Sequence, residues 1–469
     1  MRLEDPLMPL LRRTFTFTVA AAAALLAAGC AQFPTLGAGA AAQPPIVFVH
    51  GNGDSAALWH TTVWRWESNG WPADRLFALN MPSPQARDDD TKEQPGRSGS
   101  ADQRRHLAAE VDRVLAATGA RQVVLMANSR GGLAVRDCIA NGGCAGTVSH
   151  ALLGGTPNHG VWANPGFRPM NEFNGAGPFL TALNAPKGPN GDEVTPGVRW
   201  MTLRSDDNDK FAQPDGVWIG ARGTPTNVTA DGPALKGAEN VVLPRRDHRE
   251  VSYHAEAFAQ AWRFVTGTAP ATTAVAPQAR VTLDGLVTGF TPAGPTNLPL
   301  AGAEVTVYAV DAATGVRRGE ALLKKTIAAD GRWGPLVTDA RTALEFELSA
   351  PGFATAHIYR APFARSSSLV HLRPERLAAA DAQGAGAVVR FVRPRGYFGL
   401  PRDAELLDGA TAPGIPLGVA GVASSQLKVP SAEPRAVAGE FRSGAIAERI
   451  VGRTWPVAAQ RVTVLELHE

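Results

Sequence analysis

The most informative stretch of this sequence is residues 123–132, which read VVLMANSRGG. Its first four residues form an apolar run of the length expected for a buried strand, and residues 132–140 continue as a helix-like segment. Between them, the small residues Ala127 and Gly131 flank Ser129 and allow a sharp turn that exposes the serine Oγ at the end of the strand. The pattern small-x-Ser-x-Gly is weak alone, but the flanking strand and helix make Ser129 a candidate nucleophile.

The same alternation of short apolar runs and helical segments extends over residues 44–265. The other predicted strands are residues 46–49, 76–79, 151–153, 200–203 and 241–243. Before the Ser129 stretch, Leu107, Val111 and Val114 recur at helical spacing, which predicts an amphipathic helix. Strands that alternate with helices imply a mostly parallel sheet, here of about six strands, covered on both faces. The turn at Ser129 and this alternation together predict an α/β-hydrolase fold.

A segment from Val161 to Gly197 interrupts the alternation. Its large apolar residues, set among many Gly, Pro and Asn, are Trp162, Phe167, Met170, Phe173, Phe179 and Leu180. The segment is too apolar for a linker and too broken for a core helix. We interpret residues 161–197 as a lid-like insert over the site. The alternative is a loop that packs on the edge of the sheet.

The composition changes after Val265, where residues 266–273 read TGTAPATT and are typical of a domain boundary. From residue 278, alternating runs such as residues 303–308, separated by turn signals such as residues 329–331, favour an all-β module. The predicted organisation is a leader and short linker in 1–43, a catalytic domain in 44–267 and a β-rich domain in 278–469.

A serine nucleophile needs a general base, and the base needs an acid that orients it. His248 directly follows the last predicted strand and precedes a predicted helix over residues 255–264, which is where this fold presents its imidazole. The loop after the fifth strand offers several carboxylates. We choose Asp209, because Phe211 then returns to the apolar interior, and Asp207 is the second choice.

The oxyanion that develops on the substrate needs backbone N–H donors. In this fold one donor follows the first strand, where residues 50–53 read HGNG, and the other directly follows the nucleophile. These positions predict the amides of Asn52 and Arg130. The other candidate bases after Ser129 are His150, His159 and His254. We interpret His159 as pocket-lining or structural, His254 as the start of the last helix, and His50, which precedes the nucleophile, as structural.

The N-terminal residues are typical of an export signal. Arg12 and Arg13 precede an apolar run too short to span a bilayer, and residues 25–30 at its end read LLAAGC. This ending resembles a bacterial lipobox, in which Cys30 would be lipidated and become the mature N-terminus. The alternative is ordinary cleavage near residues 40–42, with Cys30 discarded. We expect an exported protein, either a membrane-associated lipoprotein of the periplasm or outer membrane, or a secreted one.

Cys138 and Cys144 are the only cysteines after the leader. A closely spaced pair in an exported chain favours a small loop-closing disulfide over a metal site, with two buried thiols as the alternative. The 46 basic and 43 acidic residues nearly balance, which gives no reason to expect a nucleic-acid partner. The motifs imply neither a cofactor nor a metal.

Residues 44–265 resemble the minimal bacterial lipases, which carry an Ala-x-Ser-x-Gly turn. A sharper resemblance is to an archaeal lipase family, whose α/β-hydrolase domain is followed by a β-barrel lipid-binding domain. It rests on residues 247–258, 270–273, 359–363 and 372–377. The resemblance supports His248 and implies a lipid- or ester-surface role for residues 278–469. That family takes its acid from the end of the strand after the nucleophile, where this chain has Gly154 and Gly155, so the loop with Asp209 stays the better source.

These features predict a serine hydrolase that cleaves carboxylic esters of acyl or lipid substrates through an acyl-enzyme. An extracellular polyester depolymerase of the polyhydroxyalkanoate type is the alternative within the same chemistry, because it uses the same triad and also needs a surface-binding β-module. The alternative of another class is a non-catalytic, lipid-anchored surface-binding protein. Such a protein would be expected to lose the serine or the histidine, and both are present.

Overall fold

The computed structural model describes residues 43–206 and 208–469. Residues 43–469 form one compact unit. Three predictions fall outside the described residues, namely lipidation of Cys30, cleavage near residues 40–42, and Asp207 as the second-choice acid. In the part of the chain that is described, no helix is long and apolar enough to cross a membrane.

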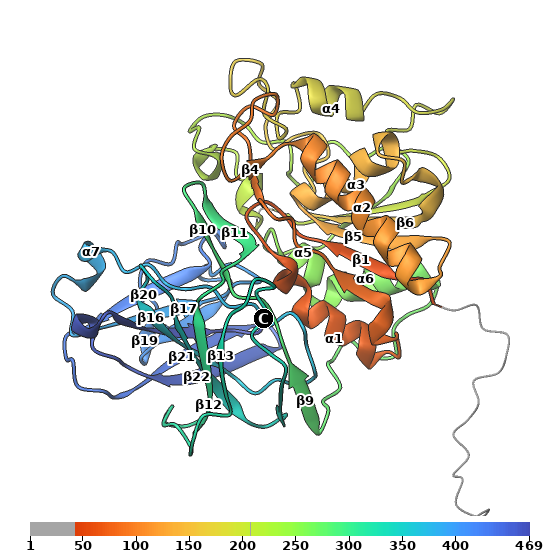
Figure 1. The fold of residues 1–469 in the computed structure, drawn as a ribbon. Helices are drawn as coiled ribbons and strands as arrows, with labels where there is room; N and C mark the ends of the chain where they lie inside the picture. The colour runs from red at the N-terminus through yellow and green to blue at the C-terminus, as the bar shows by residue number, and fades with distance from the viewer. Residues whose placement is uncertain (1–42, 207) are drawn as a thin grey trace, which may run out of the picture. The chain divides into compact units, whose positions relative to one another are not determined.

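A six-stranded sheet organises the N-terminal part of the described chain (Figure 1). Its strands, in spatial order, are β2 (Leu76–Ala78), β1 (Ile46–Val49), β5 (Val123–Asn128), β6 (Val148–Gly154), β7 (Arg199–Arg204) and β8 (Glu239–Val242). Every neighbouring pair is parallel. Helices cover both faces of the sheet, which explains why β1 and the first five residues of β5 are continuous apolar runs. The prediction of a mostly parallel α/β sheet of about six strands is confirmed.

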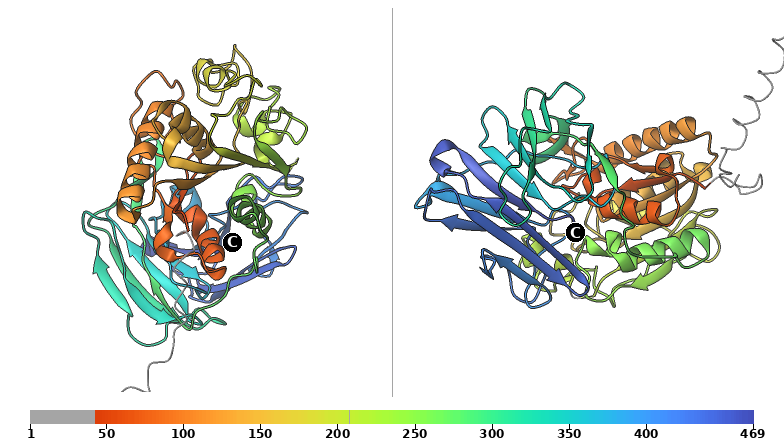
Figure 2. Two further views of the ribbon diagram at one scale, coloured as in Figure 1. Left: turned by 90° about the vertical axis from the view of Figure 1, so that its right-hand side faces the viewer. Right: turned by 90° about the horizontal axis from the view of Figure 1, so that it is seen from below.

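Two helical layers cover this sheet (Figure 2). One consists of α2 (Ser100–Thr118) and α3 (Arg130–Asn141), and the other of α1 (His60–Ser68), α5 (Glu250–Tyr253) and α6 (Ala255–Thr266). Alternate residues of β1 divide between the layers: Val47 and Val49 pack with α2 and α3, whereas Ile46 and Phe48 pack with α1 and α6. The predicted amphipathic helix is α2, whose buried residues include Leu107, Val111 and Val114. The short elements are η1 (Ala56–Trp59), η2 (Ala73–Arg75), β3 (Gln85–Ala86), β4 (Arg97–Ser98), η3 (Ala145–Thr147), α4 (Pro178–Leu183), η4 (Lys210–Ala212) and η5 (Val217–Ile219).

The rest of the described chain is rich in strands, which confirms the predicted β-rich C-terminal part. A mixed seven-stranded sheet has the order β13 (Leu323–Thr326), β12 (Glu304–Val310), β15 (Ala343–Ser349), β16 (Thr355–Arg360), β23 (Arg461–Glu466), β17 (Ala387–Val392) and β20 (Ser424–Val429). A four-stranded sheet has the order β19 (Ala410–Thr411), β18 (Ala404–Leu407), β21 (Ala436–Ser443) and β22 (Ile446–Arg453). The remaining elements are the pairs β10 (Thr288–Thr291) with β11 (Gly294–Pro299) and β9 (Arg280–Leu283) with β14 (Leu336–Asp339), and the short helices α7 (Ala379–Ala382) and η6 (Val457–Ala459). The last strand, β23, lies between β16 and β17 and runs parallel to both.

Residues 44–267, called the hydrolase part below, and residues 278–469, called the β part, share a packed junction. Trp64 of α1 is 3% exposed and belongs to the apolar core of the β part. Arg65 forms an ion pair with Glu469 at 2.7 Å, and the rings of His60 and His468 stack with centroids 5.8 Å apart. Because residues 43–469 form one unit, the division into two domains stays a prediction.

The segment 161–197, predicted as a lid, folds mostly as loops around α4. Its later half packs on the hydrolase core, where Leu183 of α4 contacts Leu133 of α3. Its earlier half contributes Trp162 and Phe173 to the cavity at Ser129. One half of the segment therefore borders the site and the other half packs on the fold, and a role as a moving lid stays a prediction.

Candidate active site

Ser129 occupies the turn between β5 and α3. Its backbone has φ 52° and ψ −123°, a conformation that residues other than glycine rarely adopt. The turn closes only because its neighbours are small. A Cβ at Gly131 would lie 2.6 Å from the carbonyl oxygen of His50, and a Cβ at Gly132 would lie 1.9 Å from Oγ1 of Thr156. These contacts explain why glycines follow the serine.

The structure brings Ser129, His248 and Asp209 together. Nε2 of His248 lies 2.8 Å from Oγ of Ser129, and Nδ1 of His248 lies 2.7 Å from Oδ2 of Asp209. The exposed fractions of Ser129, His248 and Asp209 are 9%, 5% and 4%. A carboxylate only accepts hydrogen bonds, so His248 donates from Nδ1 and its Nε2 accepts from the serine hydroxyl. The imidazole therefore has the tautomer that can take the serine proton.

Asp209 is oriented by the first turn of η4. Its Oδ1 accepts from the backbone N–H of Phe211 at 2.8 Å, which leaves Oδ2 for His248. The Phe211 ring lies edge-on to the imidazole, with ring centroids 4.5 Å apart. The return of Phe211 toward the interior, on which the choice of Asp209 rested, thus places an apolar ring beside this hydrogen bond.

Asp206 of the same loop hydrogen-bonds to backbone amides. Its carboxylate accepts from the backbone N–H groups of Asn208 at 3.1 Å and Arg245 at 2.9 Å. Burial raises the pKa of Asp206, but a hydrogen bond from the Asn208 side chain, together with these backbone hydrogen bonds, outweighs burial and leaves that pKa below its ordinary value. Asp206 therefore ties together the loops that follow β7 and β8, while Asp209 contacts the histidine.

Three other histidines of the hydrolase part have structural partners. Nε2 of His50 accepts from a backbone N–H at 3.0 Å, and burial lowers the pKa of His50 to about 4. Nδ1 of His254 accepts from the Glu256 amide in the first turn of α6, and burial lowers the pKa of His254 to about 4 as well. His159 contacts a carboxylate oxygen of Glu193 at 3.0 Å. None of these three contacts Ser129 in the described structure.

The two residues predicted to supply oxyanion donors both border Ser129. The chain after β1 packs against Ser129, since a Cβ at Gly51 would lie 3.0 Å from Cβ of Ser129. The side chain of Asn52, the next residue, accepts from the Ala86 amide at 2.7 Å, which holds this loop in place. Arg130 is the first residue of α3. Its amide belongs to the N-terminal turn of a helix, which favours negative charge nearby.

The side chain of Arg130 connects the nucleophile turn to its surroundings. It is 1% exposed and donates to the carbonyl oxygens of Pro84 at 3.1 Å and Ser98 at 2.6 Å. It also forms an ion pair with Glu172 of the segment 161–197. Burial raises the pKa of Glu172 to about 7 in spite of this arginine. Arg130 therefore links the turn to a neighbouring loop and to the segment predicted as a lid.

A cavity of about 240 Å³ opens at Ser129 and His248. Its apolar lining consists of Ala86, Val161, Trp162, Phe173, Phe211, Trp218 and Ile219. Its charged lining consists of Asp54, Arg87, Asp88, Arg97 and Arg168. Tyr397 of the β part also lines the cavity, so the β part contributes to the site directly.

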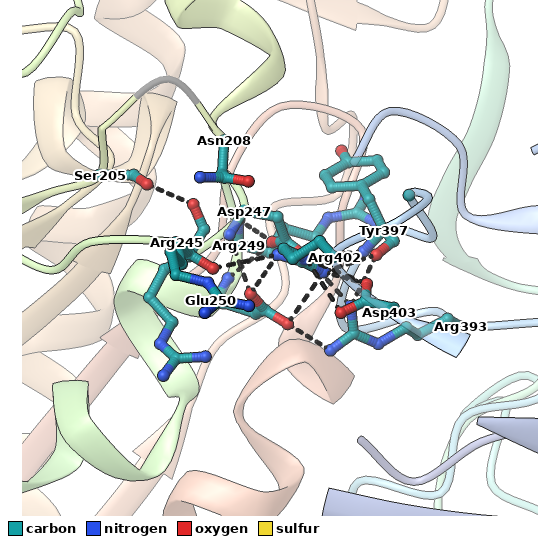
Figure 3. A network of polar contacts seen from close by, with 12 residues as sticks. Ser205, Asn208, Arg245, Asp247, Arg249, Glu250, Arg393, Tyr397, Arg402 and Asp403 are labelled. Atoms are coloured by element: carbon teal, nitrogen blue, oxygen red, sulfur yellow. Dashed lines mark hydrogen bonds and ion pairs between the residues drawn. The ribbon is translucent and has the colours of Figure 1, made fainter. Parts of the chain in front are cut away.

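Buried charges from the β part hold the loop that carries His248 (Figure 3). Asp247 and Glu250, which flank His248, are both 0% exposed. Arg393 donates to Oδ2 of Asp247 at 3.1 Å and to Oε1 of Glu250 at 2.6 Å. Arg402 donates to Oε2 of Glu250 at 2.7 Å. Burial raises the pKa of Glu250, but Arg393 and Arg402 outweigh burial and hold that pKa at about 2.

Further hydrogen bonds fix the backbone on both sides of His248. Oδ1 of Asp247 accepts from the amides of Arg249 and Glu250, each at 2.8 Å. Oδ2 of Asp247 accepts from the Tyr397 amide at 2.8 Å. No local pattern in the sequence predicts the residues that the β part contributes here, because they lie far along the chain from His248.

The structure pairs Cys138 with Cys144 in a disulfide, with Cα atoms 5.5 Å apart. Cys138 lies on α3 and Cys144 precedes η3. Both are buried in the apolar cluster that α2 and α3 form with the sheet. The bridge therefore closes the turn at the end of the helix that follows Ser129.

One group of side chains in the β part has the donor types of a metal site. Glu345, Glu347 and His357 place ligand atoms within 4.8 Å of one another. The guanidinium of Arg317 donates to both carboxylates, and the indole of Trp455 stacks on His357 with ring centroids 3.9 Å apart. Because a side-chain cation already pairs with both carboxylates, we interpret this group as a salt-bridge network.

Two families match parts of this chain. Residues 43–163, which include Asn52, Ser129 and Arg130, match the family Lipase (class 2), and residues 279–377 match the family Lipase C-terminal domain. No curated protein matches the chain.

Several solved structures are similar to this chain. Aspergillus fumigatus lipase B has 16% identity over 51% of this chain and 56% of its own length, with a TM-score of 0.35. Bacillus licheniformis lipase BlEst2 has, in its mature form, 22% identity over 44% of this chain and 85% of its own, with a TM-score of 0.31. The propeptide form of BlEst2 has 14% identity over 88% of this chain and 93% of its own, with a TM-score of 0.36. Likenesses at these TM-scores carry no further argument.

A serine at a tight strand-to-helix turn, in a parallel sheet covered on both faces, places this protein among the α/β-hydrolases. The two family matches narrow that class. The matches support an α/β-hydrolase of the lipase type, in which a region similar to class 2 lipases (residues 43–163) precedes a region similar to a lipase C-terminal domain (residues 279–377).

Proposed function

We propose that Ser129, His248 and Asp209 form a catalytic triad that hydrolyses carboxylic esters through an acyl-enzyme. The observation that carries this proposal is the unbroken hydrogen-bond chain from Oγ of Ser129, through both ring nitrogens of His248, to Oδ2 of Asp209. This chain lies beside a cavity with an extensive apolar lining.

The tautomer of His248 leaves Nε2 free to accept the hydroxyl proton of Ser129. Oγ of Ser129 attacks the ester carbonyl carbon while Nε2 of His248 takes the hydroxyl proton. Asp209 keeps its hydrogen bond to Nδ1 and stabilises the imidazolium. The carbonyl oxygen becomes an oxyanion, for which the amides of Asn52 and Arg130 are the proposed donors.

Collapse of this intermediate breaks the bond between the carbonyl carbon and the alkoxy oxygen. His248 gives its proton to the leaving alcohol, and Ser129 is left acylated. A water molecule then attacks the acyl carbon, His248 takes a proton from that water, and the proton returns to Oγ as the carboxylic acid leaves. The overall reaction consumes one ester and one water and yields one alcohol and one acid.

The substrate we propose is an acyl ester, including the esters of lipids. The cavity supports this class because aromatic and aliphatic side chains, such as Trp162, Phe173 and Trp218, offer an apolar surface to an acyl chain. A surface-binding protein without catalysis would not need a serine held in a rare backbone conformation and hydrogen-bonded to a histidine. The retained Ser129–His248–Asp209 chain therefore favours the enzyme.

The test compares wild type with Ser129→Ala, His248→Ala and the matched control Ser431→Ala, which alters an exposed serine of the β part. Turnover of short, medium and long acyl esters and release of acid from a polyester film are measured. We expect the two triad variants to lose about 10⁴-fold or more in kcat on every substrate that wild type cleaves, and the control to keep full activity. Unchanged turnover in either triad variant would contradict the mechanism. Film release that exceeds cleavage of soluble esters would make a depolymerase the better description.

We also propose that the protein is exported and is either lipid-anchored through Cys30 or released after ordinary cleavage. The disulfide Cys138–Cys144 supports export, because structural disulfides persist in oxidising compartments. Incorporation of labelled fatty acid into wild type but not into Cys30→Ser would establish the lipid anchor. A mature N-terminus near residue 43 without label would establish ordinary cleavage, and an unprocessed cytoplasmic chain would contradict export.

A further inference from the structure

Two cavities lie at the junction of the hydrolase part and the β part, apart from the cavity at Ser129. Their volumes are about 200 Å³ and 210 Å³. Both are lined by Ser55 and Ala57 of the hydrolase part and by Arg373, Pro394 and Arg395 of the β part. Because they share these residues, the two cavities are neighbours along one seam.

The carboxylates that line the seam already have cationic partners. Each of the three forms an ion pair with an arginine other than Arg373 and Arg395. The pairs are Asp54 with Arg249, Glu466 with Arg360, and Glu375 with Arg390. Each of these carboxylates therefore has its direct ion pair with an arginine other than Arg373 or Arg395.

Arg373 and Arg395 form no ion pair within the residues that the structure describes. Arg395 is 2% exposed, and its hydrogen bonds go to the backbone carbonyl oxygens of Leu467 and His468. Arg373 donates to a backbone carbonyl oxygen at 3.2 Å and to Oδ1 of Asn297 at 3.4 Å, and its buried Nε has no partner. Two guanidinium groups thus line the same cavities without a direct ion pair among the described residues, although Asp54, Glu466 and Glu375 lie close enough to act electrostatically on Arg373.

Burial and the nearby arginines lower the pKa of two histidines close to the seam. Burial lowers the pKa of His371 to about 3, with Arg373 and Arg360 adding to the effect. Burial likewise lowers the pKa of His468 to about 3, and Arg395 contributes. Burial lowers the pKa of Arg373 in spite of the opposing charges of Asp54, Glu466 and Glu375. Those carboxylates therefore do not fully offset the cost of desolvating this guanidinium, and an anion placed between Arg373 and Arg395 would reduce that cost.

We propose that Arg373 and Arg395 bind a small oxyanion of the phosphate type in the seam between the two parts. A guanidinium presents paired N–H donors that match phosphate oxygens, and two such groups that share a cavity are suited to one tetrahedral anion. The cavities are large enough for inorganic phosphate or for a small phosphate monoester such as glycerol 3-phosphate. The site is separate from the ester-cleaving machinery, so this inference does not depend on the proposed triad.

The position of the seam gives the anion a structural consequence. Asp54 lines both the seam and the cavity at Ser129, and its partner Arg249 follows His248 in the chain. An anion bound to Arg373 and Arg395 would connect the β part to the loop that borders the active site. Because it would bind the native state and not the unfolded chain, it would also raise the stability of the protein.

The test is calorimetric titration of the mature protein with sodium phosphate at pH 7.5, with sodium chloride adjusted to keep the ionic strength constant. Wild type is expected to show one saturable site. Arg373→Gln and Arg395→Gln are each expected to raise the Kd about tenfold or more, because each loses charge-assisted hydrogen bonds. Arg341→Gln, which alters an exposed arginine, is the matched control and is expected to bind as wild type does.

Titration with glycerol 3-phosphate identifies the source of the anion, because tighter binding than that of inorganic phosphate indicates a headgroup and weaker binding indicates free phosphate. If a glutamine variant fails to fold, the lysine variant at the same position keeps the charge but loses the paired donors, and weaker binding is again expected. No saturable binding to wild type would overturn the proposal, as would an equal Kd in the arginine variants. Ser129→Ala is expected to bind phosphate normally, so a failure of the triad proposal is distinguishable from a failure of this one.

Discussion

Replacing Arg393 with methionine tests whether the β part holds the loop that carries His248. The side chain keeps a similar length but loses the cation that pairs with Asp247 and Glu250, both 0% exposed. Removing one partner of a buried ion pair typically costs about 3–5 kcal/mol, because the other charge stays buried without compensation. Arg402 still reaches Glu250 at 2.7 Å, so we expect the lower end, about 3 kcal/mol of unfolding free energy at pH 7.

The loss of unfolding free energy in Arg393→Met should depend on pH in a defined direction. The folded-state pKa of Glu250 is held at about 2, below its ordinary value of 4.5. A carboxylate with a depressed pKa contributes stability that is present above the ordinary pKa and is lost as the pH falls toward the folded-state pKa. The difference between wild type and Arg393→Met should therefore be full near pH 7 and shrink as the pH falls from about 4.5 toward 2.

The assay is urea unfolding at several pH values, together with kcat on a soluble ester. Arg435→Met is the matched control, because Arg435 and its partner Asp408 have side chains 43% and 30% exposed, and exposed pairs contribute about 1 kcal/mol or less. The loss of kcat is expected to exceed the change in KM, since the loop positions His248 and does not border most of the cavity. A change in unfolding free energy below about 1 kcal/mol, or equal to that of the control, would refute the argument.

Three further predictions test other contacts. Asp209→Asn should lower kcat about 10⁴-fold with little change in folding, because an amide cannot hold the imidazole in the required tautomer; Asp206→Asn, measured in the same ester assay, should lower it far less. His254→Asn should flatten the fall in unfolding free energy between pH 6.5 and pH 4, by up to about 1.4 kcal/mol per pH unit. The reason is that His254, whose pKa is lowered to about 4 in the folded state, stays neutral there while the unfolded chain takes up a proton. Asparagine does not titrate but can still cap α6. An unchanged slope of unfolding free energy against pH, measured by denaturant titrations, would contradict this prediction. The double variant Cys138→Ser with Cys144→Ser should lose about 2 kcal/mol of unfolding free energy in denaturant titrations, the value expected for so short a loop. Dithiothreitol should lower the unfolding free energy of wild type but not that of the double variant.

The features that were predicted from the sequence share one property, which is that they are local. Residues 123–132 combine an apolar run, two small residues and a helix start, so the turn at Ser129 could be recognised without any other part of the chain. The strand runs were recognised because a parallel sheet buried on both faces demands continuous apolar sequence. His248 was predicted because this fold places its histidine after the last strand, and Asp209 was predicted because Phe211 indicated where the chain turns inward.

The features that were missed depend on pairs of residues distant in sequence. Arg393 and Arg402 could be ordinary surface arginines from their neighbours alone, yet folding inserts them between Asp247 and Glu250. Glu172, in a segment predicted as a lid, pairs with Arg130 beside the nucleophile. No periodicity or motif encodes such pairs, because a buried ion pair is specified by three-dimensional position and not by spacing along the chain.

The sequence by itself predicted the mostly parallel sheet with a β-rich part behind it, and it predicted the order of the proposed nucleophile, acid and base along the chain. Tertiary structure decided which of the described carboxylates meets His248, how the β part enters the cavity at Ser129 through Tyr397, and which arginines at the junction form no direct ion pair among the described residues. The physical reason is that backbone propensity and apolar patterning act over a few residues, whereas the balance of buried charge depends on every group that folding brings into contact.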